Sequence, residues 1–263
     1  MKVLNVSKYG LLAAALLIAA GTLWAGPGVW TSSGPNGGRV EGLVASPFTV
    51  NEYYAVTRGG VFKTIDGGVN WTDRSAGINR QVFRIVHSQT AANRLMVSGT
   101  TKVFFSNDGA LTWSDRTPPS GLLAGAILGN LAASNVAPGT YFLGLDDDRV
   151  LQTSDSGLNW TALAPIPQPG DFFITAIASN PTSSTDILVA TGDDLATNDH
   201  RLWRADLSVS PAAWTQIPCS SPCIWDDSDI RDIEFGSAGR VWAISQNGAA
   251  RSDDSGATWT VPG

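Results

Sequence analysis

The sequence predicts an all-β protein built from about five four-stranded repeats. Three observations support this prediction: a short turn motif occurs four times, tryptophans recur at a regular interval, and the composition is unusual for a globular chain. The chain has 28 Gly and 10 Trp, whereas only 15% of its residues are charged. Many short strands joined by tight turns use residues in this way, and the apolar stretches are too short and too interrupted for helices.

The turn motif has the form Ser/Thr-x-Asp-x-Gly-x-x-Trp. Its four copies are Thr64–Trp71, Ser106–Trp113, Thr153–Trp160 and Ser252–Trp259, with Ala110 in place of the glycine in the second. A worn fifth copy runs from Arg204 through Asp206 to Trp214. Together with Trp30, the tryptophans follow one another at steps of 41, 42, 47, 54 and 45 residues. This period fits one four-stranded blade of a β-propeller.

Three strands can be placed before each motif from short apolar runs between turn residues. The first strands are expected at Val40–Ser46, Val82–Ser88, Leu128–Ser134, Ile174–Asn180 and Ile230–Phe235. The second strands are expected at Tyr53–Thr57, Arg94–Ser98, Thr140–Leu145, Ile187–Thr191 and Val241–Ser245. The third strands are expected to begin at Val61, Val103, Arg149, Arg201 and Ala249.

The residue types of the motif have a structural reason. An Asp in a turn accepts hydrogen bonds from backbone N–H groups, and Gly supplies the positive φ of a tight hairpin. The Trp that follows lies on the outer strand, where its ring can fill the wedge between neighbouring sheets. We therefore interpret the motif residues as structural: Thr64, Asp66, Gly68, Trp71, Ser106, Asp108, Trp113, Thr153, Asp155, Gly157, Trp160, Asp206, Trp214, Ser252, Asp254, Gly256 and Trp259.

The N-terminus predicts export. Lys2 and Lys8 precede an apolar run from Leu11 to Trp24, and Ala25 is a plausible cleavage point, so residues 1–25 are expected to be a signal peptide and residues 26–263 the propeller domain. Retention of the leader as an uncleaved anchor is the alternative. The predicted location is secreted or periplasmic, with no membrane attachment after cleavage.

The charge balance argues against nucleic acid as a partner. Without Lys2 and Lys8 the chain has 15 basic and 23 acidic residues, a net charge of 15 − 23 = −8, which repels phosphate backbones. The only cysteines, Cys219 and Cys223, are predicted to form a local disulfide in an oxidising compartment. No cofactor is expected.

The motif and the stretch from Gly34 to Gly68 resemble the Asp-box, or bacterial neuraminidase repeat, propellers. The similarity is strongest to bacterial propellers related to photosystem II assembly factors, sortilin-type domains and xyloglucanases. This resemblance implies the fold but not one activity, because the same repeat serves glycosidases, receptors and assembly scaffolds. Known members usually have six or more blades, so the chain is either a five-bladed ring or an arc of a larger propeller that closes by self-association through its terminal edge strand.

Ligands of propellers normally bind on the face with the loops before the first strands and between the second and third strands. The charged and aromatic candidates on this face are Arg58, Arg84, Asp146, Asp147, Asp148, Asp193, Asp194, Asp199, His200, Trp225, Asp226, Asp227 and Arg231. The acidic members have three interpretations: solvated loop residues, calcium ligands, or an acid and base for glycoside hydrolysis, with Asp147 and Asp227 as the catalytic candidates. The aromatic residues Phe172, Phe173 and Trp225 are candidates for stacking on a sugar or anchoring a peptide.

The sequence favours a non-catalytic, exported module that binds a protein or a glycan. The alternative is a glycoside hydrolase of the xyloglucanase type. A sialidase is less favoured, because the segment Phe83-Arg84-Ile85-Val86 has valine where the arginine motif of sialidases has proline, and because it follows the first Asp box.

Overall fold

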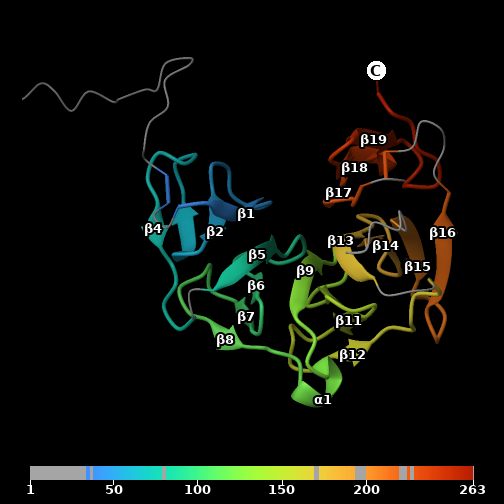
Figure 1. Cartoon of the computed structure of the whole chain (residues 1–263). Helices are drawn as coiled ribbons and strands as arrows, with labels where there is room; N and C mark the ends of the chain where they lie inside the picture. The colour runs from blue at the N-terminus through green and yellow to red at the C-terminus, as the bar shows by residue number, and fades with distance from the viewer. Residues whose placement is uncertain are drawn as a thin grey trace, which may run out of the picture. The chain divides into compact units, whose positions relative to one another are not determined.

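The computed structural model describes residues 34–35, 38–78, 81–168, 172–192, 200–218, 224–225 and 228–262. Contacts divide the chain into residues 1–32 and 33–263, and all described residues belong to the second unit. This unit consists of five antiparallel sheets, each formed by consecutive strands and arranged as the blades of a propeller (Figure 1). The predicted fold class is therefore confirmed. Within these ranges no helix has the length and apolar character needed to cross a membrane.

Each blade contains strands in chain order, from the innermost to the outermost. Blade 1 comprises β1 (Val40–Ala45), β2 (Tyr53–Thr57), β3 (Gly60–Thr64) and β4 (Thr72–Asp73). Blade 2 comprises β5 (Val82–His87), β6 (Leu95–Gly99), β7 (Val103–Ser106) and β8 (Ser114–Asp115), and blade 3 comprises β9 (Leu128–Ala133), β10 (Tyr141–Leu145), β11 (Val150–Thr153) and β12 (Thr161–Ala162). Blade 4 comprises β13 (Phe173–Ser179), β14 (Asp186–Gly192), β15 (Arg201–Asp206) and β16 (Ala213–Ile217).

Blade 5 has three full strands, β17 (Asp232–Phe235), β18 (Val241–Ser245) and β19 (Gly248–Ser252). Its fourth strand is reduced to one bridge between Arg251 and Thr260. The short helix α1 (Ser120–Leu123) in the linker between blades 2 and 3 was not expected from the sequence. The strand positions otherwise agree with the sequence pattern to within two residues.

Apolar side chains pack between successive blades rather than in one central core. We call the face of a blade that looks toward the next blade its trailing face, and the opposite face its leading face. Tyr54 and Val56 on the trailing face of blade 1 pack against Ile85 and Val97 on the leading face of blade 2. Similar clusters join blades 2 and 3, blades 3 and 4, and blades 4 and 5. Strand alternation with a period of two makes this possible, because it gives every blade two apolar faces.

The motif turns are held by their Ser or Thr and Asp side chains. In the first copy, Asp66 accepts hydrogen bonds from the backbone N–H of Asn70 (2.9 Å) and from the Thr64 hydroxyl (2.7 Å). The Thr64 hydroxyl oxygen in turn accepts the N–H of Gly68 (3.0 Å), whose φ of 97° lies in the left-handed region. Ala110 adopts the same region at 68°, so the turn persists there without glycine. The interpretation of these carboxylates as turn-forming groups agrees with the geometry.

The motif tryptophans connect neighbouring blades. Trp113 of blade 2 donates its indole N–H to the carbonyl of Arg74 at the end of blade 1 (2.7 Å). Trp160 makes the equivalent bond to Arg116 (2.8 Å), and Trp214 of the worn copy to Ala164 (2.8 Å). Each ring also joins the apolar cluster between its blade and the preceding one. The indole thus fills the wedge and also satisfies a backbone carbonyl of the linker.

Replacing Trp160, which is 8% exposed, should destabilise the protein strongly. Trp160→Ala removes a buried ring and its hydrogen bond to Arg116, so we expect a loss of about 3 to 5 kcal/mol in the free energy of unfolding, measured by urea denaturation. Trp71→Ala is the matched control, because Trp71 is only half-buried and bonds within its own turn, to Gly68. Equal losses in the two variants would contradict a special role for contacts between blades.

The motif carboxylates should make folding sensitive to acid. Hydrogen bonds from the backbone and side chain of Asn70 hold the pKa of Asp66 at about 2, and those from Thr258 do the same for Asp254. In the unfolded chain such groups titrate near pH 3.9, so their stabilising effect is complete above that pH and is lost as the pH falls toward 2. We expect the free energy of unfolding to fall less steeply between pH 4 and 2 in an Asp66→Asn/Asp254→Asn variant. An unchanged slope would show that other groups control acid unfolding.

Candidate functional site

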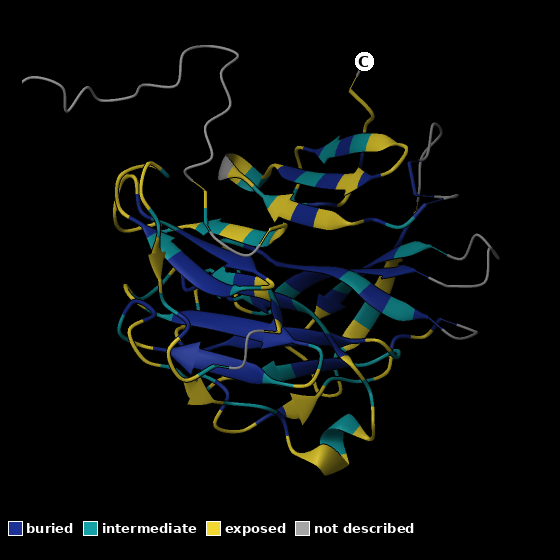
Figure 2. Ribbon diagram, turned by 60° about the vertical axis from the view of Figure 1, so that its left-hand side comes forward, coloured by how far each residue is buried: buried dark blue, intermediate teal, exposed yellow. Residues whose placement is uncertain are grey.

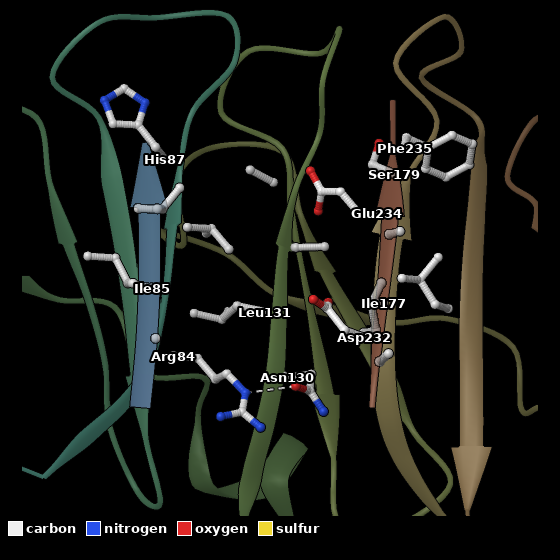
Figure 3. A pocket seen from close by; sticks show the side chains of 18 of the residues that line it. Arg84, Ile85, His87, Asn130, Leu131, Ile177, Ser179, Asp232, Glu234 and Phe235 are labelled. Carbon is white, nitrogen blue, oxygen red and sulfur yellow. Dashed lines mark hydrogen bonds between the residues drawn. The ribbon is translucent and has the colours of Figure 1, made fainter. Parts of the chain in front are cut away.

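The first strands of all five blades line a central channel. This cavity has a volume of about 630 Å³ and is bordered by β1, β5, β9, β13 and β17 (Figure 3). One position recurs in each strand because the ladders have the same register: Gly42, Arg84, Asn130, Ala176 and Asp232. The channel wall is therefore polar in blades 2, 3 and 5.

A chain of hydrogen bonds crosses the channel wall from blade 2 to blade 4. Arg84 donates from Nε to Oδ1 of Asn130 (2.8 Å), as the dashed line in Figure 3 shows. Asn130 then donates from Nδ2 to the carbonyls of Ile174 (3.1 Å) and Thr175 (2.5 Å). The guanidinium of Arg84 is thereby held in place, and its Nη1 also donates to the carbonyl of Phe83 (3.3 Å).

Two carboxylates enter the channel from blade 5. Asp232 and Glu234 are two residues apart on β17 and point into the cavity from the same side of the strand (Figure 3). Among the described residues neither has a hydrogen-bond or ion-pair partner. The side chain of Glu234 is exposed, yet nearby protein atoms still displace part of its water and, together with the charge of Asp232, raise the pKa of Glu234.

A second, cationic cavity lies at the end of the channel where the first strands begin. It has a volume of about 360 Å³, and Arg39, Arg58 and Arg84 contribute to its lining together with Glu41. Glu41 is largely buried and lies 3.2 Å from Nε of Arg39 and 3.5 Å from Nε of Arg58. Three guanidinium groups share a single carboxylate, so this mouth is locally positive in an otherwise acidic chain.

The acidic loop residues do not converge within the described part of the chain. Asp146 accepts a hydrogen bond from the N–H of Ile127 (2.6 Å). The catalytic candidate Asp147 is paired with Arg149 (3.0 Å), which also donates to the carbonyls of Leu122 and Leu123 in α1. Asp147 thus has a structural role, because it helps to hold Arg149 against α1.

The remaining acidic candidates divide into described and undescribed residues. Asp148 is part-exposed beside Asp147. Asp193, Asp194, Asp199, Asp226 and Asp227 lie outside the described residues, as do Cys219 and Cys223. His200 lies 2.8 Å from a carboxylate oxygen of Asp229, which ties the β14–β15 connection to the linker before blade 5. No group of three His, Cys, Asp or Glu side chains in the described ranges is placed to hold a metal ion, so the calcium alternative has no ligand set there.

Trp225 requires a correction. It was expected to offer its ring to a ligand, but it is only 3% exposed and packs edge-to-face on Trp259, with ring centroids 5.6 Å apart. Phe172 is 5% exposed and belongs to the cluster between blades 3 and 4. Both rings fill wedges between blades, and the sequence alone does not distinguish this role from stacking on a ligand.

Of the expected ligand residues, the structure brings Arg58 and Arg84 together at the mouth and places Arg231 on the channel wall. Sequence reasoning missed Arg39, Glu41, Asn130, Asp232 and Glu234. Alignment of the five first strands on their buried positions would have shown that these strands carry polar residues where small or apolar ones are usual. Three of the missed residues lie at such positions.

The comparisons with known proteins support the fold. The sequence matches no protein-family model and no curated protein. Among solved structures, the chain is similar to a GH74 xyloglucanase from Xanthomonas campestris, with a TM-score of 0.61, 16% identity, and coverage of 80% of this chain and 36% of that one. It is also similar to YCF48 from Cyanidioschyzon merolae, with a TM-score of 0.55, 18% identity, and coverage of 81% of this chain and 69% of that one.

A third similar structure is the extracellular domain of a protein described as a one-component system from B. thetaiotaomicron. Its TM-score is 0.59 at 13% identity, with coverage of 81% of this chain and 27% of that one. The chain thus spans about a third of the length of the xyloglucanase that it matches. These propellers include both an enzyme and proteins of other kinds, so the likeness establishes the architecture and leaves the function open.

The protonation of Glu234 should depend on its neighbour. Because the charge of Asp232 contributes to the raised pKa, Asp232→Asn should lower the pKa of Glu234 while leaving it above its usual range. Carboxyl carbon NMR of the Glu234 side chain across pH 3 to 7 would measure the shift, with Asp253→Asn as a control at a carboxylate outside the channel. No difference between the variants would mean that Asp232 is too far away or too well screened to act.

Proposed function

We propose that this protein is a non-catalytic, extracytoplasmic binding propeller that holds an anionic group of a protein or glycan partner at the mouth of its channel. The observation that carries this proposal is the cationic cavity, which is lined by Arg39, Arg58 and Arg84 and by one carboxylate, Glu41, that pairs with Arg39 and Arg58. Guanidinium groups bind carboxylates in a two-pronged geometry, which makes arginine the usual residue for such recognition.

The surroundings of the cavity support a binding role. The channel wall fixes Arg84 through Asn130, so part of the conformational cost of binding is met before the partner arrives. The residues around the cavity come from blades 1, 2 and 3, so a partner at the mouth would contact three blades. A partner larger than the cavity would extend over the loops that connect the second and third strands.

The negative net charge of the chain makes binding of an anionic probe a specific test. Nonspecific electrostatic attraction cannot cause an acidic protein to bind a polyanion. We therefore suggest titrating the protein with galacturonate oligomers and with an oligo-glutamate peptide, using neutral xyloglucan oligosaccharides as the uncharged control. Isothermal titration calorimetry would report the affinity for each probe.

We expect at least one carboxylate probe to bind, and Arg58→Gln or Arg84→Gln to weaken it about tenfold or more, since hydrogen bonds to charged groups contribute about 1.5 to 3 kcal/mol. Arg240→Gln is the matched control, because Arg240 pairs with Asp253 in blade 5, away from the mouth. Binding that is equally weak in all three variants, or no binding of either acidic probe, would refute the proposal.

A glycoside hydrolase is the second candidate, and the carboxylate pair on β17 is the observation in its favour. Glycoside hydrolysis requires two carboxyl groups that act as acid and as base or nucleophile, and Asp232 and Glu234 border one cavity, where the pKa of Glu234 is raised. The test is the release of reducing sugars from xyloglucan. Turnover that disappears in Glu234→Gln would establish this activity and overturn the non-catalytic assignment.

A further inference from the structure

The inner edge of the leading face of blade 1 is exposed. Leu43 occupies the same register position as Ile85, Leu131, Ile177 and Ile233, each of which pairs with the middle residue of its second strand. Those four side chains are between 3% and 8% exposed, whereas Leu43 is 62% exposed. Farther out on the same face Ala55 and Phe62 are only 1% and 5% exposed, so the opening is confined to the inner strand.

The trailing face of blade 5 is open in the same way. Ile244 corresponds in register to Val56, Ser98 and Ala190, which are at most 1% exposed, yet Ile244 is 47% exposed. Trp242, on the same side of β18, is part-exposed as well. Figure 2 shows exposed and part-exposed residues along the strands of the last blade, whereas the second and third strands of blades 2 and 3 are almost entirely buried.

We call the region between these two faces the seam, formed by Leu43, Asp232, Glu234, Trp242 and Ile244. The apolar clusters cover the four interfaces between successive blades, and no cluster of described residues joins blade 5 to blade 1. Leu43 from one side and Asp232 and Glu234 from the other border the same cavity. The seam therefore combines exposed apolar side chains with two carboxylates that lack described partners.

The carboxylates determine what can cover the seam. In blades 1 to 4 the position of Glu234 is held by Val44, Val86, Ala132 and Ala178, which pack against or beside the next blade. A purely apolar blade over Asp232 and Glu234 would desolvate both charges, which costs several kcal/mol for each ion. A second copy of this chain would bring Leu43 to the seam, but it carries the same net negative charge and is therefore unfavourable opposite Asp232 and Glu234 as well.

We propose that the seam is a docking surface for an extended segment of another protein, which places an apolar side chain against Leu43 and Ile244 and a lysine or arginine against Asp232 and Glu234. Each side of the seam is a pleated sheet face with alternate side chains, so an extended segment matches its spacing. The seam residues do not line the cationic mouth, but Arg84 borders both cavities, so Arg58→Gln is the variant that tests the mouth independently.

The test uses two synthetic peptides of equal length with blocked ends, one alternating Lys and Val and the other alternating Glu and Val. Fluorescence anisotropy of the labelled peptides would give their affinity for the full chain. We expect the Lys-Val peptide to bind and the Glu-Val peptide not to bind. Asp232→Asn/Glu234→Gln and, separately, Ile244→Asp should each raise the dissociation constant about tenfold or more, a change of about 1.4 kcal/mol or more.

Two controls separate the seam from general attraction to an acidic protein. Asp115→Asn/Asp206→Asn removes the same number of charges elsewhere, and Val50→Asp places a charge at a loop residue that is 86% exposed; both should change the affinity less than twofold. Asp232→Asn/Glu234→Gln keeps the shape of both side chains, so it removes the charges without disturbing the fold. Circular dichroism would show whether Ile244→Asp has misfolded.

Three results would overturn the proposal. The first is a loss of affinity for the Lys-Val peptide in the Asp115→Asn/Asp206→Asn control equal to that in the seam variants. The second is the absence of any binding of the Lys-Val peptide to the unaltered chain. The third is a dimer in sedimentation velocity that Leu43→Asp dissociates, because it would identify a second copy as the occupant. Arg58 does not border the channel cavity, so Arg58→Gln leaves the seam unchanged, and failure of the cationic mouth would not produce any of these results.

Discussion

The indole of one blade bonding to the linker of the blade before it is the contact on which the ring depends. Trp113, Trp160 and Trp214 each place a large apolar ring in the wedge between two sheets and donate an N–H to a carbonyl of the preceding blade. A small sheet with two apolar faces cannot fold alone, because at least one face would remain in water. Each of these three tryptophans therefore joins its blade to the preceding one and covers part of an apolar face that would otherwise lie in water.

The motif turn makes that rule reproducible. In all four copies the Ser or Thr hydroxyl donates to the Asp carboxylate, which holds the hairpin before the tryptophan in the same hydrogen-bonded form. The worn copy is informative. It has a different Asp turn, in which Asp206 binds Ser208 (2.8 Å), and yet Trp214 still reaches the carbonyl of Ala164. The contact between blades is thus kept even where the turn that presents it has changed.

This mode of assembly also explains where binding chemistry is found. Residues on the two faces of a blade are committed to packing, so variation is tolerated mainly on the inner edges, at the mouth and at the two ends of the series of blades. The cationic mouth draws on first strands and their entry segments, whereas the seam exists because the first and last blades each lack one neighbour. The two surfaces differ in charge, and this difference lets one small propeller present distinct sites to different partners.

The sequence by itself determined the repeat, the strand positions and the structural role of the motif residues, because these depend on local turn chemistry and on alternation with a period of two. It also singled out Arg58 and Arg84, which the structure brings together at the mouth. The tertiary structure alone decided that Trp225 is buried against Trp259, that Asp147 is paired with Arg149, and that Arg39 joins the mouth. These outcomes depend on which blades lie side by side and how closely they approach. Only the folded chain fixes that relation, because it brings together residues that are far apart in the sequence.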